Sequence, residues 1–234
     1  MSDAAPAVAH DIAARVAAVC DRIAVAARAS GRDPSAVRLV AATKTQPVEV
    51  LAAVLAAGVT DLGENRAQEL VAKAPALADA DPGPTWHFIG RLQRNKINQL
   101  VPWVSWWESV DRPELVAALA TRAPGARILV EVNIAAEPQK GGCAPAALPA
   151  LVDQARAVGL EVAGLMTVAP AAGDPRPHFA AVRELGTTVG VAELSMGMSG
   201  DFEAAIAEGA TIVRVGSALV GPRGAFPRFG PGER

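Results

Sequence analysis

The feature that most constrains the fold is a regular alternation between short apolar runs and amphipathic runs. The apolar runs, rich in Val, Ile, Leu and Ala, occur eight times. They cover residues 37–44, 59–64, 85–90, 106–111, 126–133, 161–170, 192–197 and 211–221. Strands buried on both faces of a parallel sheet have this continuous apolar character. The pattern predicts an α/β fold in which each strand is followed by a helix or a helical turn.

Eight such units in about 200 residues predict a single (β/α)8 TIM barrel near the small end of its size range. The alternative is an open doubly wound sheet, which is less favoured because no GxGxxG follows the first strand. Residues 1–36 read as an extra N-terminal helix and a turn, from apolar residues at three- and four-residue steps. No linker divides residues 1–234, so we expect one domain. The Pro-, Gly- and Arg-rich tail at 222–234 is expected to be flexible.

Composition narrows the class of protein. The net charge is −2, which predicts no general attraction to nucleic acid or to an anionic membrane. The N-terminus lacks the apolar core of a signal peptide, and no run of about 20 apolar residues could span a bilayer. Cys20 and Cys143 have no metal-binding spacing and are expected to be reduced thiols. We therefore expect a cytoplasmic protein, as a monomer or alternatively a dimer.

Lys44 is the first candidate for chemistry, because it ends the first strand and barrels carry their active sites at the carboxyl ends of strands. Strand alternation places Lys44 on the same face as Val40 and Ala42. A buried lysine there would favour the neutral amine that a Schiff base requires. The alternative is a lysine that extends from the strand end into water. The pattern alone leaves both open.

Arg214 is the second candidate, because it lies within the last apolar run and on the same face as Ile212. A charge in a buried strand needs a partner or a ligand. The structural alternative is an ion pair with a carboxylate such as Glu131 or Asp61. His87, in "WHFIG", could act as an acid or base, but we expect a strand histidine satisfied by backbone.

The loop "SMGMSGD" after the seventh strand and the loop "VGSALVG" after the eighth predict a phosphate site. Both are small and contain Gly and Ser, so backbone N–H groups can approach an anion. The alternative is ordinary helix capping, with Ser199 as the N-cap. Asp201 at the helix start would repel a phosphate, so we expect it to face away. Together with Lys44 and Arg214, these loops suggest a phosphorylated carbonyl compound held as an imine.

Several longer motifs occur in a fixed order between residues 37 and 223. They are "LVAATKTQP", "DLGENRAQE", "WHFIGRLQRNK", "SVDR", "VEVNI", "GLMT" and "ELSMGMSGDFEAAIAEGATIVRVGSALVG". Together they resemble the pyridoxal phosphate homeostasis proteins, the YggS/PROSC-type family. The resemblance implies a fold-type III barrel that binds pyridoxal 5′-phosphate (PLP) and is similar to the N-terminal barrel of alanine racemase.

The resemblance also implies the roles of individual residues. Lys44 matches the lysine that holds PLP as an internal aldimine, Asn65 lies near the ring substituents, Met166 lines the ring pocket and Arg214 faces the pyridine nitrogen. The phosphate-binding positions match Ser199, Gly200, Gly216 and Ser217. No residue is given a catalytic role.

Lys140, in "EPQKGG", matches a family lysine near the site, without an assigned role. Gly141 and Gly142 follow it where many members have Ser or a similar residue. We expect this pair of glycines to loosen the loop.

The function implied by the resemblance is intracellular PLP homeostasis, as a carrier or buffer without turnover, with PLP-dependent apoenzymes as candidate partners. A two-base racemase is disfavoured because the chain has no tyrosine and no residues left for a second domain. A PLP-dependent enzyme acting on amino acids remains the alternative. A class I aldolase is disfavoured because those barrels typically carry the Schiff-base lysine on a later strand, and "GLMTV" has none.

Overall fold

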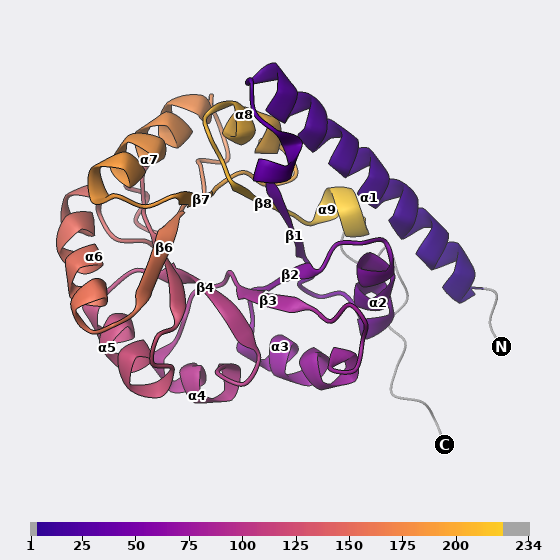
Figure 1. Cartoon of the computed structure of the whole chain (residues 1–234), viewed down its shortest axis with the longest axis horizontal. Coiled ribbons are helices and arrows are strands. Elements are labelled where there is room, and N and C mark those ends of the chain that lie inside the picture. The colour runs from indigo at the N-terminus through magenta and orange to yellow at the C-terminus, as the bar shows by residue number, and fades with distance from the viewer. Residues whose placement is uncertain (1–3, 222–234) are drawn as a thin grey trace.

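Eight parallel strands form a closed barrel in the computed structural model, which describes residues 4–221. The strand order follows the chain, and the last strand pairs with the first. Figure 1 shows the strands at the centre with the helices around them. The predicted barrel is thus confirmed, and the open sheet is wrong.

The strands are β1 (Arg38–Ala42), β2 (Asp61–Glu64), β3 (Thr85–Phe88), β4 (Val104–Val110), β5 (Arg127–Glu131), β6 (Glu161–Met166), β7 (Glu193–Ser195) and β8 (Ile212–Val215). The helices are α1 (Ala4–Ala29), α2 (Val48–Ala56), α3 (Ala67–Lys73), α4 (Ile97–Leu100), α5 (Pro113–Arg122), α6 (Leu148–Ala157), α7 (Arg176–Val189), α8 (Phe202–Ala207) and α9 (Ser217–Val220). Short 3-10 helices lie at Pro34–Ala36, Ala74–Leu77, Arg94–Lys96 and Pro145–Ala147. The predicted flexible tail at 222–234 lies outside the described residues.

Two strands end earlier than the sequence pattern predicts. β1 ends at Ala42, so Lys44 lies in the loop that follows it. Thr45 turns the chain there with a φ of 65°, which is incompatible with a continuing strand. The last apolar run also divides, because Gly216 interrupts it and α9 begins at Ser217.

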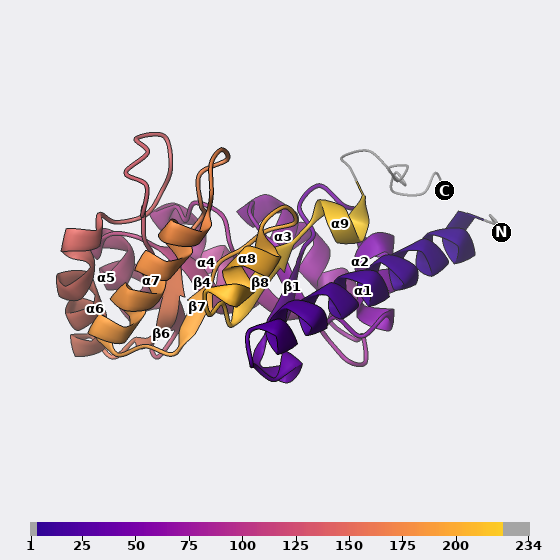
Figure 2. The same ribbon diagram turned by 90° about the horizontal axis from the view of Figure 1, so that it is seen from above.

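The N-terminal helix packs along the outside of the barrel. Its apolar stripe is buried and consists of Ile12, Val16, Val19, Ile23 and Ala27. This stripe lies against α2, α8 and α9, as the views in Figures 1 and 2 agree. The predicted helix is confirmed, and it covers barrel helices that would otherwise expose apolar surface. Within residues 4–221, no helix has the length and apolar character needed to cross a bilayer.

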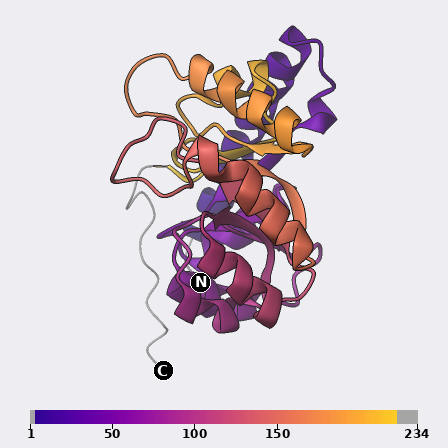
Figure 3. The same cartoon turned by 90° about the vertical axis from the view of Figure 1, so that its left-hand side faces the viewer.

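The apolar core has two layers. The larger one lies between the strands and the surrounding helices, of which α4 to α7 form the flank that faces the viewer in Figure 3. The smaller one fills the barrel interior with Val40, Trp106, Leu129, Met166 and Ile212. Trp106 stacks on His87 with ring centroids 5.4 Å apart, so it belongs to the core, as expected.

Two features of the barrel wall bear on the site. β7 and β8 are joined at one register pair, Ser195 with Ile212, which makes this the least extensive seam. β6 and β7 approach so closely that a Cβ at Gly164 would lie 2.0 Å from the carbonyl oxygen of Glu193. The loops after β5 and β6 project from the same end of the barrel (Figures 2 and 3), which is the end where the strands finish.

Candidate functional site

A cavity of about 590 Å³ opens where the strands end. Its volume lies within the range of about 300–1,000 Å³ that is typical of small-molecule sites. Seven of the eight predicted site residues line it: Lys44, Asn65, Ser199, Gly200, Arg214, Gly216 and Ser217. The structure therefore brings together residues that are up to 173 positions apart in the chain (217 − 44).

Met166 is the predicted residue that the structure does not bring to the cavity. Its side chain is 2% exposed and packs in the barrel interior against Val40 and Ile212. Val168, two residues further on, lines the cavity instead, and so does Met198. The strand ends at Met166, so its side chain still points into the packed interior below the cavity.

Lys44 lies at the cavity wall with an exposed side chain. The alternative of a lysine that extends into water is therefore confirmed and the buried lysine is wrong, although the exposed side chain still lines the cavity. Its position comes from the loop after β1 rather than from strand alternation.

Arg214 is buried at the cavity floor and is held by groups of two neighbouring strands. Its Nη1 donates to Ser195 Oγ at 2.7 Å, and its Nη2 donates to the carbonyl oxygen of Thr167 at 2.7 Å. The carboxylate within ion-pair distance is Glu108, with Oε2 4.0 Å from Nη1. Neither Glu131 nor Asp61 lies within ion-pair distance of Arg214, so the predicted ion pair with one of them is wrong. Burial lowers the pKa of Arg214, while the charge of Glu108 opposes that shift.

His87 is fully buried between two carboxylates, so the expectation that backbone satisfies it is wrong. Its Nδ1 lies 2.5 Å from Glu108 Oε1, and its Nε2 lies 2.9 Å from Asp61 Oδ1. Carboxylate oxygens at both ring nitrogens favour the ring with a proton on each nitrogen, because a carboxylate is a hydrogen-bond acceptor. Burial disfavours the charged ring, but the hydrogen bonds to Asp61 and Glu108 outweigh it and raise the pKa of His87.

These contacts form one chain of hydrogen bonds across the barrel interior. Ser195 Oγ donates to Glu108 Oε2 at 2.5 Å and accepts from Arg214, which links Asp61 and His87 to the cavity floor. Sequence reasoning missed this chain, because its members lie on five different strands. A histidine and a glutamate within otherwise apolar strands were the only signal that could have found it.

The glycine-rich end of the cavity is held together by Ser199. Its Oγ accepts hydrogen bonds from the N–H groups of Gly216 at 3.2 Å and Ala218 at 3.5 Å, so the two loops are joined. The alternative, in which Ser199 is the N-cap of α8, is wrong because Asp201 occupies the N-cap position. Asp201 Oδ1 accepts from the N–H of Met198 at 2.6 Å, and Asp201 does not line the cavity. That Asp201 faces away from a phosphate stays a prediction.

The donor set fits PLP. The exposed amine of Lys44 suits the aldehyde, and the buried guanidinium of Arg214 offers N–H donors to an acceptor. Asn65 Oδ1 is buried and has no partner within residues 4–221, so a ligand donor in the cavity would satisfy it. A Cβ at Gly200 would meet no atom within 4 Å, which leaves open space beside the loop backbone.

A smaller cavity of about 100 Å³ adjoins the first through Val168 and contains Glu131 and Lys140. Burial, and then the charge of Asp111, raise the pKa of Glu131 to about 7, against the opposing charges of Arg214 and Arg91. Lys140 Nζ donates to the carbonyl oxygen of Ala169 at 2.9 Å.

The loop beside Lys140 approaches the end of β5 closely at its second glycine. Gly142 has a φ of 105°, and a Cβ there would lie 2.5 Å from the backbone nitrogen of Asn133. Backbone hydrogen bonds join Cys143 to Glu131 and to Asn133. Gly142 is therefore needed for a close approach, and the loosening of the loop by the two glycines stays a prediction.

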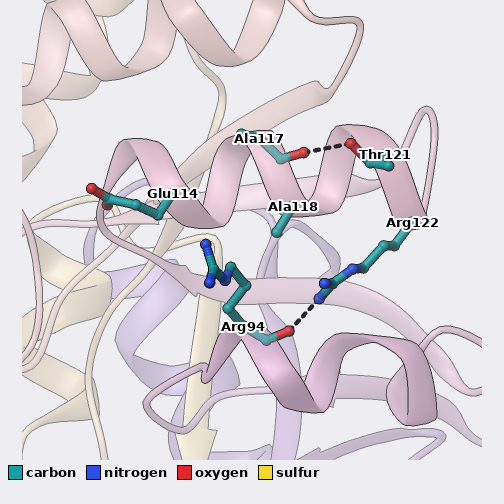
Figure 4. Close-up of a pocket in the computed structure, with 6 residues that line it drawn as sticks. All are labelled: Arg94, Glu114, Ala117, Ala118, Thr121 and Arg122. Atoms are coloured by element: carbon teal, nitrogen blue, oxygen red, sulfur yellow. Dashed lines mark hydrogen bonds between the residues drawn. The ribbon is translucent and has the colours of Figure 1, made fainter.

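A third cavity, of about 390 Å³, lies at the surface between α5 and the 3-10 helix at Arg94–Lys96 (Figure 4). Arg122 donates to the carbonyl oxygen of Arg94 across it, and Glu114 and Thr121 complete its polar lining. It shares no lining residue with the first cavity. We assign no chemistry to it.

Comparisons with known proteins identify the family of the chain. The family model of the alanine racemase N-terminal domain matches residues 14–224. The pyridoxal phosphate homeostasis protein of Pseudomonas aeruginosa is 42% identical over 222 residues, which cover 91% of this chain and 96% of that protein. The corresponding protein of Bos taurus is 37% identical, covering 88% of this chain and 85% of that protein.

Solved structures of similar proteins point to the same family. A structure of PipY from Synechococcus elongatus with PLP bound is 34% identical, with a TM-score of 0.78 over 90% of this chain and 100% of that one. A structure described as that of an unknown protein from Bifidobacterium adolescentis is 37% identical, with a TM-score of 0.84 over 94% of this chain and 97% of that one. Alanine racemase from Corynebacterium glutamicum, at 17% identity and a TM-score of 0.61, shares the fold over 86% of this chain and 60% of that one. From its sequence and its structure alike, the chain belongs to the pyridoxal phosphate homeostasis protein family.

Proposed function

We propose that the protein binds PLP covalently through Lys44 and serves in its intracellular supply as a carrier or buffer without turnover. The observation that carries the proposal concerns the lysines. The sequence contains four, and Lys44 is the exposed one that lines the large cavity. Lys73 is buried and paired, Lys96 lies away from the cavity, and Lys140 is hydrogen-bonded to backbone.

The chemistry requires little else from the chain. The Lys44 amine, once unprotonated, attacks the aldehyde carbon of PLP, and one water leaves as the carbon–nitrogen double bond forms. PLP supplies an electron sink to amines that reach it. Arg214 and the Ser- and Gly-rich loops would hold the ring and the phosphate, and Asn65 offers a free acceptor. This arrangement supports retention of a cofactor.

The absence of tyrosine from the whole sequence supports a role without racemisation. Release of PLP to PLP-dependent apoenzymes, in the cytoplasm, is part of the same proposal. The open mouth of the cavity at Lys44 supports it, because an incoming amine can reach the bound carbon without a change of fold. The protein would act there as a monomer or a dimer.

The test is the absorbance spectrum of the purified protein with and without PLP. We expect a Schiff-base band in the wild type that disappears in Lys44→Ala. Lys96→Ala serves as the control and should keep the band. Borohydride reduction followed by peptide mapping should place the label on Lys44. A wild-type protein that stays colourless with excess PLP, or a label on another lysine, contradicts the proposal.

The transfer step needs a separate measurement. Loaded protein is mixed with a PLP-dependent apoenzyme across a range of concentrations, and recovery of that enzyme's activity is followed. We expect recovery faster than spontaneous release into buffer allows. Recovery at the rate of free release would limit the protein to a buffering role.

A second candidate function is supported by Glu131. Glu131 lines the small cavity that adjoins the large cavity lined by Lys44. Because its pKa is about 7, its carboxyl group is suited to accepting or donating a proton at neutral pH. This favours a PLP-dependent enzyme acting on amino acids. Racemase and decarboxylase assays with the loaded protein decide between the two, since turnover that is lost in Glu131→Gln would support the enzyme.

A further inference from the structure

One buried lysine contacts three acceptors beside the cavity. Lys73 ends α3 and is 8% exposed. Its Nζ donates to Glu64 Oε1 at 2.7 Å, to Glu69 Oε2 at 3.2 Å and to the carbonyl oxygen of Thr43 at 3.1 Å. An ammonium group has three protons to donate, and all three are used here.

The same acceptors fix the segment that carries Lys44. Thr43 Oγ1 donates to Glu64 Oε1 at 2.9 Å, and the backbone N–H of Thr45 donates to Glu69 Oε2 at 2.7 Å. The residue before Lys44 and the residue after it are therefore both tied to carboxylates that Lys73 neutralises. None of these hydrogen bonds involves Lys44 itself.

The backbone on one side of Lys44 is strained. Thr45 has a φ of 65°, in the left-handed region that a β-branched residue rarely occupies. Such a conformation persists where the surroundings enforce it, and it tends to occur at functional sites. Two contacts hold this turn: the N–H of Thr45 donates to Glu69 Oε2 at 2.7 Å, and the N–H of Gln46 donates to the carbonyl oxygen of Thr43 at 3.1 Å.

The cluster is poorly suited to stabilising the fold. Glu64 is fully buried, and its Oε2 has no partner within residues 4–221. Burial raises the pKa of Glu64 even with Lys73 beside it. Well-packed apolar residues often stabilise a protein as well as a buried ion pair does, so stability alone does not account for these groups.

We propose that Lys73 is a positioning residue for Lys44. Through Glu64, Glu69 and Thr43 it holds the backbone on both sides of Lys44, so that the amine stays at the cavity wall before PLP arrives. Preorganisation of this kind removes the cost of ordering the loop from the binding step. The inference rests on the proposed covalent binding of PLP by Lys44 and adds that a second lysine, which never contacts PLP, governs that binding.

The experiment compares two ligands in Lys73→Met. The first is PLP, followed by its Schiff-base absorbance, and the second is 4-deoxypyridoxine 5′-phosphate, which lacks the aldehyde and tests the cavity without the covalent bond. We expect the affinity for PLP to fall by about 10-fold, because the loop that carries Lys44 must then be ordered at the binding step. Affinity for the deoxy analogue should change by less than about twofold, because the loops that hold the phosphate are untouched.

Arg66→Gln is the matched control. Arg66 Nη1 donates to the other oxygen of Glu69 at 3.3 Å, but its side chain is 67% exposed and it does not contact Lys73. We expect wild-type binding of both ligands. Glu69→Ala, at a partly exposed position, removes the acceptor of Thr45 and should reproduce the effect of Lys73→Met. It also carries the test if Lys73→Met does not fold.

The possible results distinguish a failure of the positioning role from a failure of the proposed function. Equal PLP binding by the wild type and the folded variants overturns the inference, and so does an equal loss of both ligands, which would indicate general collapse of the cavity. A wild-type protein that fails to form the absorbance band contradicts the proposed function instead. A selective loss of PLP binding supports the positioning role.

Discussion

Two carboxylates share one imidazole inside the barrel, and this arrangement sets the pH response of single residues. His87 lies between Asp61 and Glu108, whose hydrogen bonds favour its positively charged form, and Arg214 lies beyond Ser195 on the same chain of hydrogen bonds. His87 and Arg214 therefore share one network with Asp61 and Glu108, and Arg38 Nη1 lies 3.7 Å from Asp61 Oδ1 at its end. Charges buried in this way depend on one another, so a change in protonation of one alters the stability of the whole fold.

The first prediction concerns His87. Because its pKa is raised in the folded protein, its stabilising contribution is present in full below the ordinary value of 6.5 and is lost as pH rises through the higher folded pKa. The groups that face the ring are Asp61 on β2, Glu108 on β4 and the stacked Trp106. In His87→Gln we expect a loss of about 3–5 kcal/mol near pH 6 that shrinks at higher pH.

Urea unfolding between pH 5 and pH 9 measures this dependence. His10→Gln is the control, because His10 is exposed on α1. A constant difference in unfolding free energy between wild type and His87→Gln across that range would contradict a charged His87.

The second prediction concerns Glu131, whose folded pKa of about 7 lies above its ordinary value of 4.5. The folded protein then binds a proton more tightly than the unfolded chain does. Its free energy of unfolding falls as pH rises from about 4.5 to about 7, by about 1.4 kcal/mol for each pH unit within that interval. Glu131→Gln should therefore be more stable than wild type at pH 8 and similar to it at pH 4. Thermal melting at both values is the measurement, and an equal melting difference at both would exclude the raised pKa.

At the scale of elements, the order and number of strands followed from the sequence, whereas their ends and their mutual contacts did not. Apolar runs predicted all eight strands, because burial on both faces leaves a plain compositional pattern. The turn at Thr45 was not predicted, since a threonine with a positive φ has no sequence signal. The contacts of His87 and Lys73 depend on how neighbouring strands and helices are aligned with one another, and this alignment cannot be read from the pattern of a single sequence.

The third prediction tests the approach of β6 to β7. Gly164→Ala places a Cβ against the carbonyl oxygen of Glu193, so the two strands must separate. We expect a loss of about 1–3 kcal/mol in unfolding free energy, as for overpacked cores. Gly200→Ala is the control, because its Cβ would meet open space and its φ is not positive. Chemical denaturation without ligand is the measurement, and equal stability of the two variants would show that the strands yield easily.

At the scale of the whole molecule, α1 is part of the barrel's outer layer rather than an appendage. Its stripe of buried residues lies against helices from both ends of the chain, α2 on one side and α8 and α9 on the other. The helix therefore joins the first and last units of the barrel on the outside, as β1 and β8 join them on the inside. The amphipathic spacing predicted the helix, but not the face of the barrel that it covers.

The fourth prediction follows from that packing. Ile12 is completely buried on α1, so Ile12→Ala should cost about 2–5 kcal/mol of unfolding free energy. Val25, on the same helix, is 66% exposed, and Val25→Ala should change it by less than about 0.5 kcal/mol. Urea denaturation compares the two. A negligible effect at Ile12 would mean that α1 detaches from the barrel at little cost.

The seam between β7 and β8 has a consequence for the cavity. One register pair and three backbone hydrogen bonds join the chain at these strands, and the side chain of Arg214 on β8 adds bonds to Ser195 of β7 and to Thr167 after β6. The Arg214 side chain therefore connects three neighbouring strands while its guanidinium forms the floor of the cavity. A ligand that draws the guanidinium toward itself would weaken these connections, so the affinity for a ligand and the rigidity of the barrel wall are coupled.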